Sequence, residues 1–109
     1  MPQYGSTVFT ASASQSALNI TTATVVKAAA GKLSRIVIVA PGTTSGAFTI
    51  NDCAAVAAAT AANTIWSQAY NGAPAIAGQV ITLDWPVKNG IVVSAVPGGG
   101  SPILSISYI

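Results

Sequence analysis

The chain of 109 residues contains no histidine and no glutamate, and its only acids are Asp52 and Asp84. Histidine and the two acids carry most proton-transfer chemistry in enzymes, and histidine and cysteine hold most structural zinc. Its single cysteine, Cys53, leaves the chain without a Cys–His pair for nucleophilic catalysis and without a zinc ligand set. We therefore expect no enzymatic activity, no catalytic residue, no metal site and no cofactor.

Charge is scarce as well. Charged residues make up 6% of the chain, against about 25% in a typical soluble domain. The cations Lys27, Lys32, Arg35 and Lys88 leave a net charge of +2, but they neither cluster nor alternate with stacking aromatics, so we do not expect a nucleic-acid partner. Low surface charge gives little protection from association, which is typical of a protein that works inside an assembly.

Long apolar runs are also missing. The most apolar stretch, residues 53–62, is rich in alanine and about half as long as the roughly 20 residues that a membrane helix needs. Residues 1–7 show neither a basic nor a long apolar region, so we expect no secretory signal and a chain made and folded in a cytoplasm. Cys53 is expected to be a small buried residue, because most free cysteines are.

Short runs of β-branched and aliphatic residues fill the rest of the chain, and turn residues interrupt them every 8 to 15 positions. This spacing is typical of an all-β sandwich or barrel, and it predicts about seven strands. A length of 109 residues allows one domain. We therefore predict an extended N-terminal arm over residues 1–16 and a single β-sandwich over residues 17–109, whose strand order, jelly-roll or immunoglobulin-like, the sequence leaves open.

Three of the predicted strands carry distinct patterns. A strand over 18–26 places Leu18, Ile20 and Val26 on one face. Residues 33–40 are apolar on both faces, which predicts a central strand that is covered on both sides. The final run, 103–109, alternates apolar residues with serine, which predicts a strand paired inside a sheet.

Turn and cap residues complete the prediction. Asp52 precedes the alanine run as a helix N-cap would, so we expect one or two helical turns or a compact loop there. Pro86 restricts its strand to a sheet edge or ends its regular pairing. Asn89-Gly90 stands between β-forming residues, the strongest short signal for a hairpin. Asp84 is expected to cap a turn or to pair with Lys88.

Three motifs could suggest a catalytic or ligand-binding role, but each has a simpler structural explanation. Gly98–Gly100 lacks the lysine and the strand-to-helix turn of a phosphate loop, and we interpret it as a plain turn. Asp52 and Asp84 resemble a glycosidase pair only in number. Trp66, Trp85 and the tyrosines could form a sugar-binding platform, but with 6% aromatic residues the rings are needed for the core.

Candidate interface residues lie in two places. The arm contains Tyr4 and Phe9, which would anchor it on a neighbouring subunit if the arm is not simply a frayed terminus. Lys27, Lys32 and Arg35 are interpreted as charges at the rim of an interface. We expect the sheet faces to form contacts between copies, and the arm with its nearby loops to meet a larger partner.

Several short stretches together resemble a group of small virion proteins of tailed bacteriophages. The stretches are Gly31–Ile36, Ile50–Ala54, Leu83–Pro86, Asn89–Val93 and Ser105–Tyr108. The resemblance covers roughly residues 25–109 and leaves the arm outside. It implies an all-β module without catalytic residues, and it favours the jelly roll over the immunoglobulin-like sandwich.

The resemblance also implies a function. Proteins of this group are capsid decoration (cement) proteins, head fibres, or tail and neck components. We predict a decoration protein that binds and stabilises the outer shell of a virion as a homo-oligomer, a dimer or trimer. Its partners would be the major capsid protein or other virion proteins. The alternatives are a tail, neck or head-fibre component and a module that binds glycans or a host surface.

Overall fold

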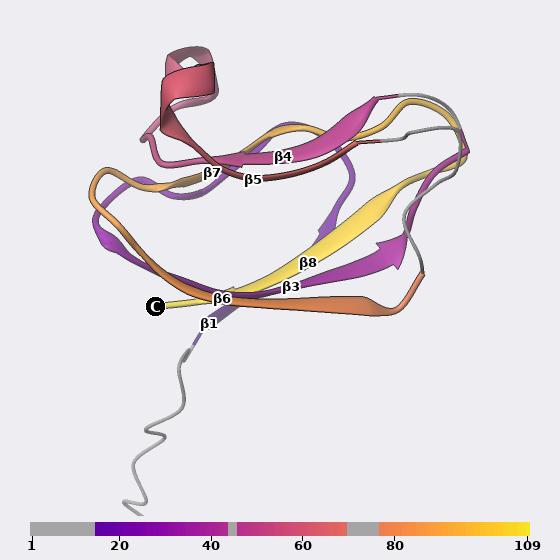
Figure 1. Cartoon of the computed structure of the whole chain (residues 1–109), viewed down its shortest axis with the longest axis horizontal. Helices are drawn as coiled ribbons and strands as arrows, with labels where there is room; N and C mark the ends of the chain where they lie inside the picture. The colour runs from indigo at the N-terminus through magenta and orange to yellow at the C-terminus, as the bar shows by residue number, and fades with distance from the viewer. Residues whose placement is uncertain (1–14, 44–45, 70–76) are drawn as a thin grey trace, which may run out of the picture.

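The computed structural model describes residues 15–43, 46–69 and 77–109, which form two four-stranded antiparallel sheets packed face to face. Sheet A has the strand order β1-β8-β3-β6, and sheet B has the order β2-β7-β4-β5. Figure 1 shows the two sheets as two layers, with sheet B above sheet A. The all-β prediction and the sandwich are confirmed.

Eight strands make up the two sheets, where the sequence predicted about seven. They are β1 (Gln15–Ile20), β2 (Thr24–Lys27), β3 (Gly31–Ala40), β4 (Ala47–Asn51), β5 (Thr64–Ala69), β6 (Gln79–Val87), β7 (Ile91–Ala95) and β8 (Ile103–Tyr108). β1 begins at Gln15, so the first strand starts two residues before the boundary predicted at residue 17.

The pairing of the strands is nested. The first four strands pair with the last four in reverse order, β1 with β8, β2 with β7, β3 with β6 and β4 with β5, and every pair is antiparallel. Only the β4–β5 connection stays within one sheet, because every other connection crosses from one sheet to the other. The chain is thus one long double strand, bent at β4–β5 and wrapped around its own core.

The core lies between the sheets. Its members are the inward-facing aliphatic residues of both layers together with Phe48: Ile20, Leu33, Ile36, Ile38, Phe48, Ile50, Val87, Ile91, Val93, Leu104 and Ile106. Alternation along each strand places these residues on one face, as the period of two requires. Cys53 is buried as predicted.

The strand predicted over residues 18–26 is wrong. The structure divides it into β1 in sheet A and β2 in sheet B. Asn19 adopts a left-handed conformation (φ 56°) at a register shift in β1, so that Ile20 is buried while Leu18 is 72% exposed. Thr24 Oγ1 then donates to the carbonyl of Thr22 (2.8 Å), a local bond that competes with strand pairing.

β3 is central, as predicted, because it lies between β8 and β6. The prediction that both of its faces are covered is wrong. Ile36 and Ile38 are buried in the core, whereas Val37 is half-buried and Val39 is 47% exposed on the outer face of sheet A. The described residues place no second layer there, so the outward apolar residues of β3 face solvent.

The hairpin predicted at Asn89-Gly90 is also wrong, because β6 and β7 belong to different sheets. The turn is an arch between the layers. At Gly90, a Cβ atom would collide with the backbone oxygens of Cys53 and Lys27, so only glycine fits this crossing.

The alanine-rich run forms a compact loop with two single 3₁₀ turns, η2 (Val56–Ala58) and η3 (Ala61–Asn63), as predicted. Asn51, 2% exposed, holds this loop. Its Nδ2 donates to the Thr60 carbonyl (2.9 Å) and to Asn63 Oδ1 (2.8 Å), and its Oδ1 accepts from Ser94 Oγ (2.5 Å). The loop therefore has a fixed position on the outer side of sheet B (Figure 1).

β8 is the final described strand, and it is paired on both sides as predicted, with β1 and with β3. Beyond it, Ile109 exchanges two backbone hydrogen bonds with Lys32, of 2.9 and 3.1 Å. Residues 107–109 therefore link β1 to β3, because they pair with both strands.

We expect deletion of residues 107–109 to unfold the domain, because it removes pairing partners of β1 and β3 together with the bonds to Lys32. Thermal unfolding followed by circular dichroism tests this. Ile109→Ala is the control, since it keeps the backbone bonds and alters a side chain that is 41% exposed. A truncated chain that melts at the temperature of the full chain would show that β8 is dispensable.

Candidate functional site

The outer face of sheet A is the most distinctive surface of the described chain. Its outward positions are set by register, since Val37 lies opposite both Ser105 and Val80, and Arg35 lies opposite Ser107 and Thr82. The strand β8 thus contributes only short serine side chains in the middle, and its neighbours contribute larger ones.

Large apolar side chains stand exposed on this face. Leu18 is 72%, Val80 56% and Val39 47% exposed, and they come from three different strands, β1, β6 and β3. Arg35 brings the only positive charge among the outward positions in the middle of the face. An apolar face with so little charge is typical of a surface that another molecule covers.

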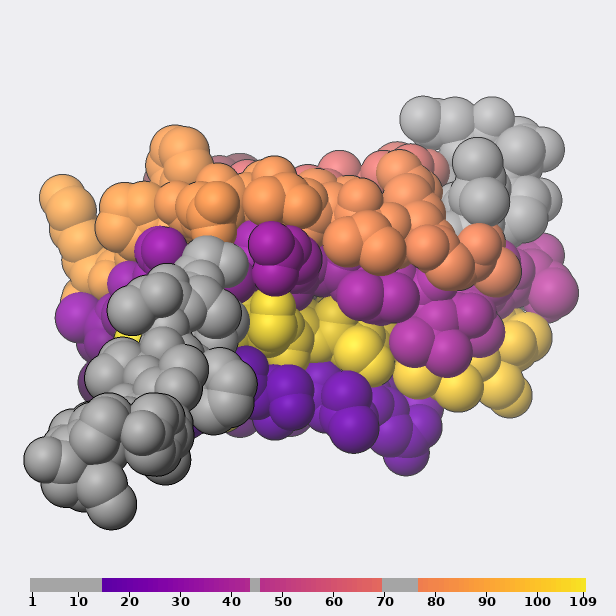
Figure 2. All heavy atoms as spheres, turned by 90° about the horizontal axis from the view of Figure 1, so that it is seen from below, coloured from indigo at the N-terminus to yellow at the C-terminus, as the bar shows by residue number. Residues whose placement is uncertain are grey.

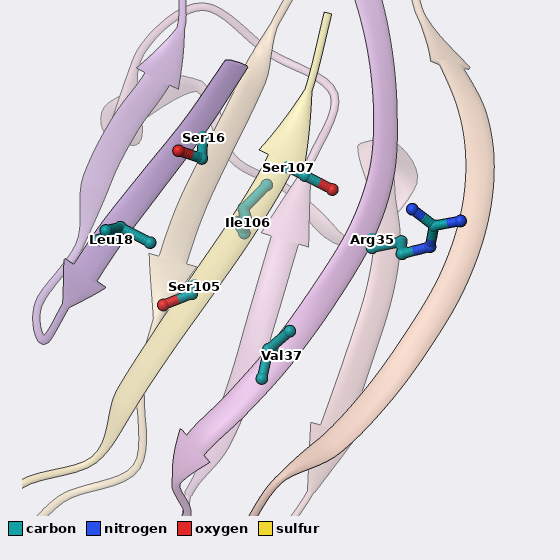
Figure 3. Close-up of a pocket in the computed structure, with 7 residues that line it drawn as sticks. All are labelled: Ser16, Leu18, Arg35, Val37, Ser105, Ile106 and Ser107. Carbon is teal, nitrogen blue, oxygen red and sulfur yellow. The ribbon is translucent and has the colours of Figure 1, made fainter. Parts of the chain in front are cut away.

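A groove of about 190 Å³ runs over β8 on this face. Its lining residues are Ser16, Leu18, Arg35, Val37, Ser105, Ile106 and Ser107. Figure 2 shows the yellow atoms of β8 recessed between the bands of β3 and β1, and Figure 3 shows that the walls come from these two strands. The small side chains of β8 create the hollow, and Leu18 and Val37 make its walls apolar.

Two polar groups at the groove have no partner in the part of the chain that the structure describes. The Oγ atom of Ser107 is buried and makes no hydrogen bond. The exposed guanidinium of Arg35 makes no ion pair with a described residue, since the ion pair found there joins Lys32 and Asp84. In Figure 3 the guanidinium extends from the β3 wall toward β6. The groove therefore combines an apolar hollow with a free cation at its rim.

The alanine-rich loop lies against part of the outer side of sheet B, where Val25 remains 43% exposed. Val92 is fully buried although both of its neighbours, Ile91 and Val93, point into the core. Alternation places Val92 on the outer side, where η2 packs against β7. The loop thus covers part of sheet B, and residues 15–43, 46–69 and 77–109 provide no similar cover for the outer face of sheet A.

The predicted interface residues are only partly brought together. Tyr4 and Phe9 lie outside the described residues. Lys32 and Arg35 both lie on β3, but Lys32 forms an ion pair with Asp84 (Nζ–Oδ1 3.9 Å), which corrects the predicted pairing of Asp84 with Lys88. Lys27 lies on β2, in the other sheet. Of the predicted cations, Arg35 alone lines the groove.

Sequence reasoning missed Leu18 and Val80 as surface residues. The outer face of sheet A could have been predicted from the apolar run in β3, because Val37 and Val39 point outward and outward apolar residues are usually buried by another layer or molecule. The run predicted a strand that is covered on both faces, but it did not identify what covers the outer one.

Arg35 and Asp84 lie near the middle of β3 and β6, and the other four charged residues, Lys27, Lys32, Asp52 and Lys88, lie toward one end of the sandwich. This end holds the β2–β3 and β6–β7 turns, the alanine-rich loop and the end of β8. The described residues that connect strands at the opposite end, 21–23, 41–43, 46, 77–78 and 96–102, include no charge. The Gly98–Gly100 stretch belongs to this uncharged end, where it links β7 to β8 as the predicted plain turn.

Asp52 performs a structural task at the charged end. It is not the helix cap that its position predicted, because Ala55 precedes η2 without any side-chain cap. Its carboxylate instead accepts the backbone N–H groups of Lys88 (3.0 Å), Asn89 (2.8 Å) and Gly90 (3.2 Å). These bonds tie the start of the alanine-rich loop to the arch between the sheets.

The bonds also set the charge state of Asp52. Burial alone raises the pKa of this carboxyl. The three N–H donors and the positive charge of Lys88 lower the pKa by a larger amount, so the net pKa lies below the ordinary value of 3.8. The charged form is therefore the one that the fold stabilises.

No three histidine, cysteine, aspartate or glutamate side chains gather into a metal site among residues 15–43, 46–69 and 77–109. No helix in this described part is long and apolar enough to cross a membrane. The chain is similar to no family model, no curated protein and no solved structure. The groove and its surrounding face are thus the features from which function must be argued.

We expect the stability that Asp52 provides to be complete above the unfolded-state pKa, near 3.8, and to disappear as the pH falls through its lowered folded-state pKa. Asp52→Ala should cost about 1–3 kcal/mol at neutral pH, because the buried N–H of Gly90 loses its acceptor. Urea unfolding between pH 7 and pH 2 measures both effects.

Asp84→Asn is the matched control for charge, because it removes the other acidic side chain of the sequence. Its ion pair with Lys32 is solvent-exposed, so we expect it to change stability by well under 1 kcal/mol. If Asp84→Asn and Asp52→Asn changed the loss of stability at low pH by the same amount, the hydrogen bonds of Asp52 would not be the cause of that loss.

Proposed function

We propose that the chain is a non-enzymatic structural protein of a bacteriophage virion, a decoration (cement) protein that binds and stabilises the outer shell. The observation that carries this proposal is the combination of the strand order with the bare apolar face of sheet A. The strand order supports a capsid-type fold, and the bare face supports permanent contact with another surface. The virion is then its location, after assembly in the cytoplasm of the host.

The strand order supports a jelly roll. In that fold, eight strands form two sheets by wrapping a long antiparallel pair. An immunoglobulin-like sandwich instead keeps several consecutive strands in one sheet, whereas here only β4 and β5 do so. Jelly rolls are common in viral capsid proteins and in lectins. The fold is therefore compatible with a structural role and with a glycan-binding role, and the surface residues distinguish between them.

The surface supports the structural role. A bound glycan needs polar side chains and exposed rings, and the groove offers aliphatic walls and three serines. A shell surface, by contrast, is a large protein partner that would bury Leu18, Val39 and Val80 together. The major capsid protein is the partner that this role implies, with other virion proteins as the alternative.

Self-association is part of the proposal, as a dimer or trimer. β6 is an edge strand, as Pro86 predicted, and it exposes Val80 and Trp85, the latter by 52%. Half-exposed tryptophan is enriched where subunits meet. A small domain with a limited core also gains stability from association, which suits a symmetric oligomer.

The role predicts abundance. In purified particles of the phage that encodes it, the protein should be present at a copy number comparable with that of the major shell protein, because a decoration protein occupies every repeat of the lattice. Quantitative mass spectrometry of the particles measures the ratio. A few copies at one vertex would instead identify a tail, neck or head-fibre component, and absence from the particle would overturn the virion role.

The glycan-binding alternative rests on Trp85, the half-exposed ring. Trp85→Ala should leave the melting temperature within a few degrees of wild type, because half of the side chain is already in solvent. Trp66→Ala is the matched variant, and it should cost more, about 2–4 kcal/mol, since Trp66 packs against the core. Glycan-array binding that Trp85→Ala abolishes would favour a host-binding module over the decoration protein.

A further inference from the structure

We propose that the groove over β8 binds an extended segment of a different protein, and that this segment places an apolar side chain between Leu18 and Val37 and a carboxylate on Arg35. The inference deepens the proposed function, on which it rests for the expectation that the partner is a protein. It names the contact surface and the chemistry of the residues that would occupy it.

The apolar part of the site is sized for one side chain. The groove has a volume of about 190 Å³, and a cavity of about 150 Å³ is enough to hold a benzene ring. Its walls are Leu18 and Val37, and its floor is the backbone around Ile106 with the short side chains of Ser105 and Ser107. One leucine, phenylalanine or tyrosine side chain would fill the hollow and remove its apolar walls from water.

Charge complementarity predicts that the bound segment carries a carboxylate next to its apolar side chain. Arg35 stands at the rim, and its guanidinium has no ion-pair partner among the described residues. A planar guanidinium is suited to a two-point contact with a carboxylate. Ser107 Oγ, buried at the same groove without a hydrogen bond, offers a further donor or acceptor to the incoming backbone.

The same argument disfavours a second copy of this chain as the occupant. The sequence has only two acidic side chains. Asp52 is committed to the three backbone N–H groups of the arch, and Asp84 is paired with Lys32. Another copy therefore offers Arg35 only Asp84, which already lies beside Lys32, and a face-to-face pair would bring two guanidinium groups together. We therefore assign the carboxylate to a different protein.

A selection on the intact protein tests this inference. The immobilised chain is exposed to a library of random linear peptides, and the enriched peptides are resynthesised and titrated by calorimetry. We expect them to share a leucine-sized or aromatic residue close to an aspartate or glutamate. No enrichment over the bare support, or enrichment of peptides without an acid, would overturn the inference.

Variants locate the binding. Arg35→Glu should weaken the selected peptides about tenfold or more, and Ser105→Trp should block them by filling the groove. Lys27→Glu is the matched control, since it changes the net charge equally from a strand of the other sheet, and it should bind as wild type does. Arg35→Gln gives a neutral variant of the same position should the reversal impair folding. Equal binding by Arg35→Gln and wild type would contradict the role of Arg35.

Two further outcomes separate this inference from the proposed function. A wild-type oligomer that Arg35→Glu or Ser105→Trp disperses would show that a second copy covers the face, and would overturn the choice of partner. If the protein is abundant in virions and the two variants still bind shells as tightly as wild type, the function stands and the groove is not the contact. Acidic peptides that bind a protein absent from virions would support the site and reject the function.

Discussion

Two sheets that pack against each other have four faces, and the core can cover only two of them. This constraint governs the rest of the molecule, because a chain of this length has little left with which to cover the outside. It uses its one long connection within a sheet, the loop from Cys53 to Asn63, to cover Val92 on sheet B. The described residues place nothing comparable over sheet A, whose outward valines and leucine are exposed.

How much of this could be predicted from sequence depends on the range of the interactions. Local patterns were sufficient for the all-β class, for the edge position of the strand with Pro86 and for the paired final strand, since each follows from alternation or from a missing N–H. Long-range partners were not predictable. Asn89-Gly90 has the composition of a hairpin, but the turn is held by Asp52, 37 positions away, and crosses between the sheets.

The candidate site shows the same division. Arg35 was named from its charge, and the outward apolar residues of β3 were visible in the run from Ile36 to Val39. The groove itself depends on three strands that are far apart in the sequence, and on a register shift in β1 that turns Leu18 outward. A one-residue irregularity of this kind reverses which side chains face the core, and no periodicity in the sequence announces it.

The nested pairing of the strands has a consequence for how the protein is made. Because β1 and β3 both pair with β8, sheet A has no continuous hydrogen-bond network until β8 has been synthesised. Nearly every sheet contact joins segments distant in sequence, which is the topology of slow-folding proteins. Until β8 is added, β3 lacks one of its two neighbours, and the exposed edge of such an apolar strand favours aggregation.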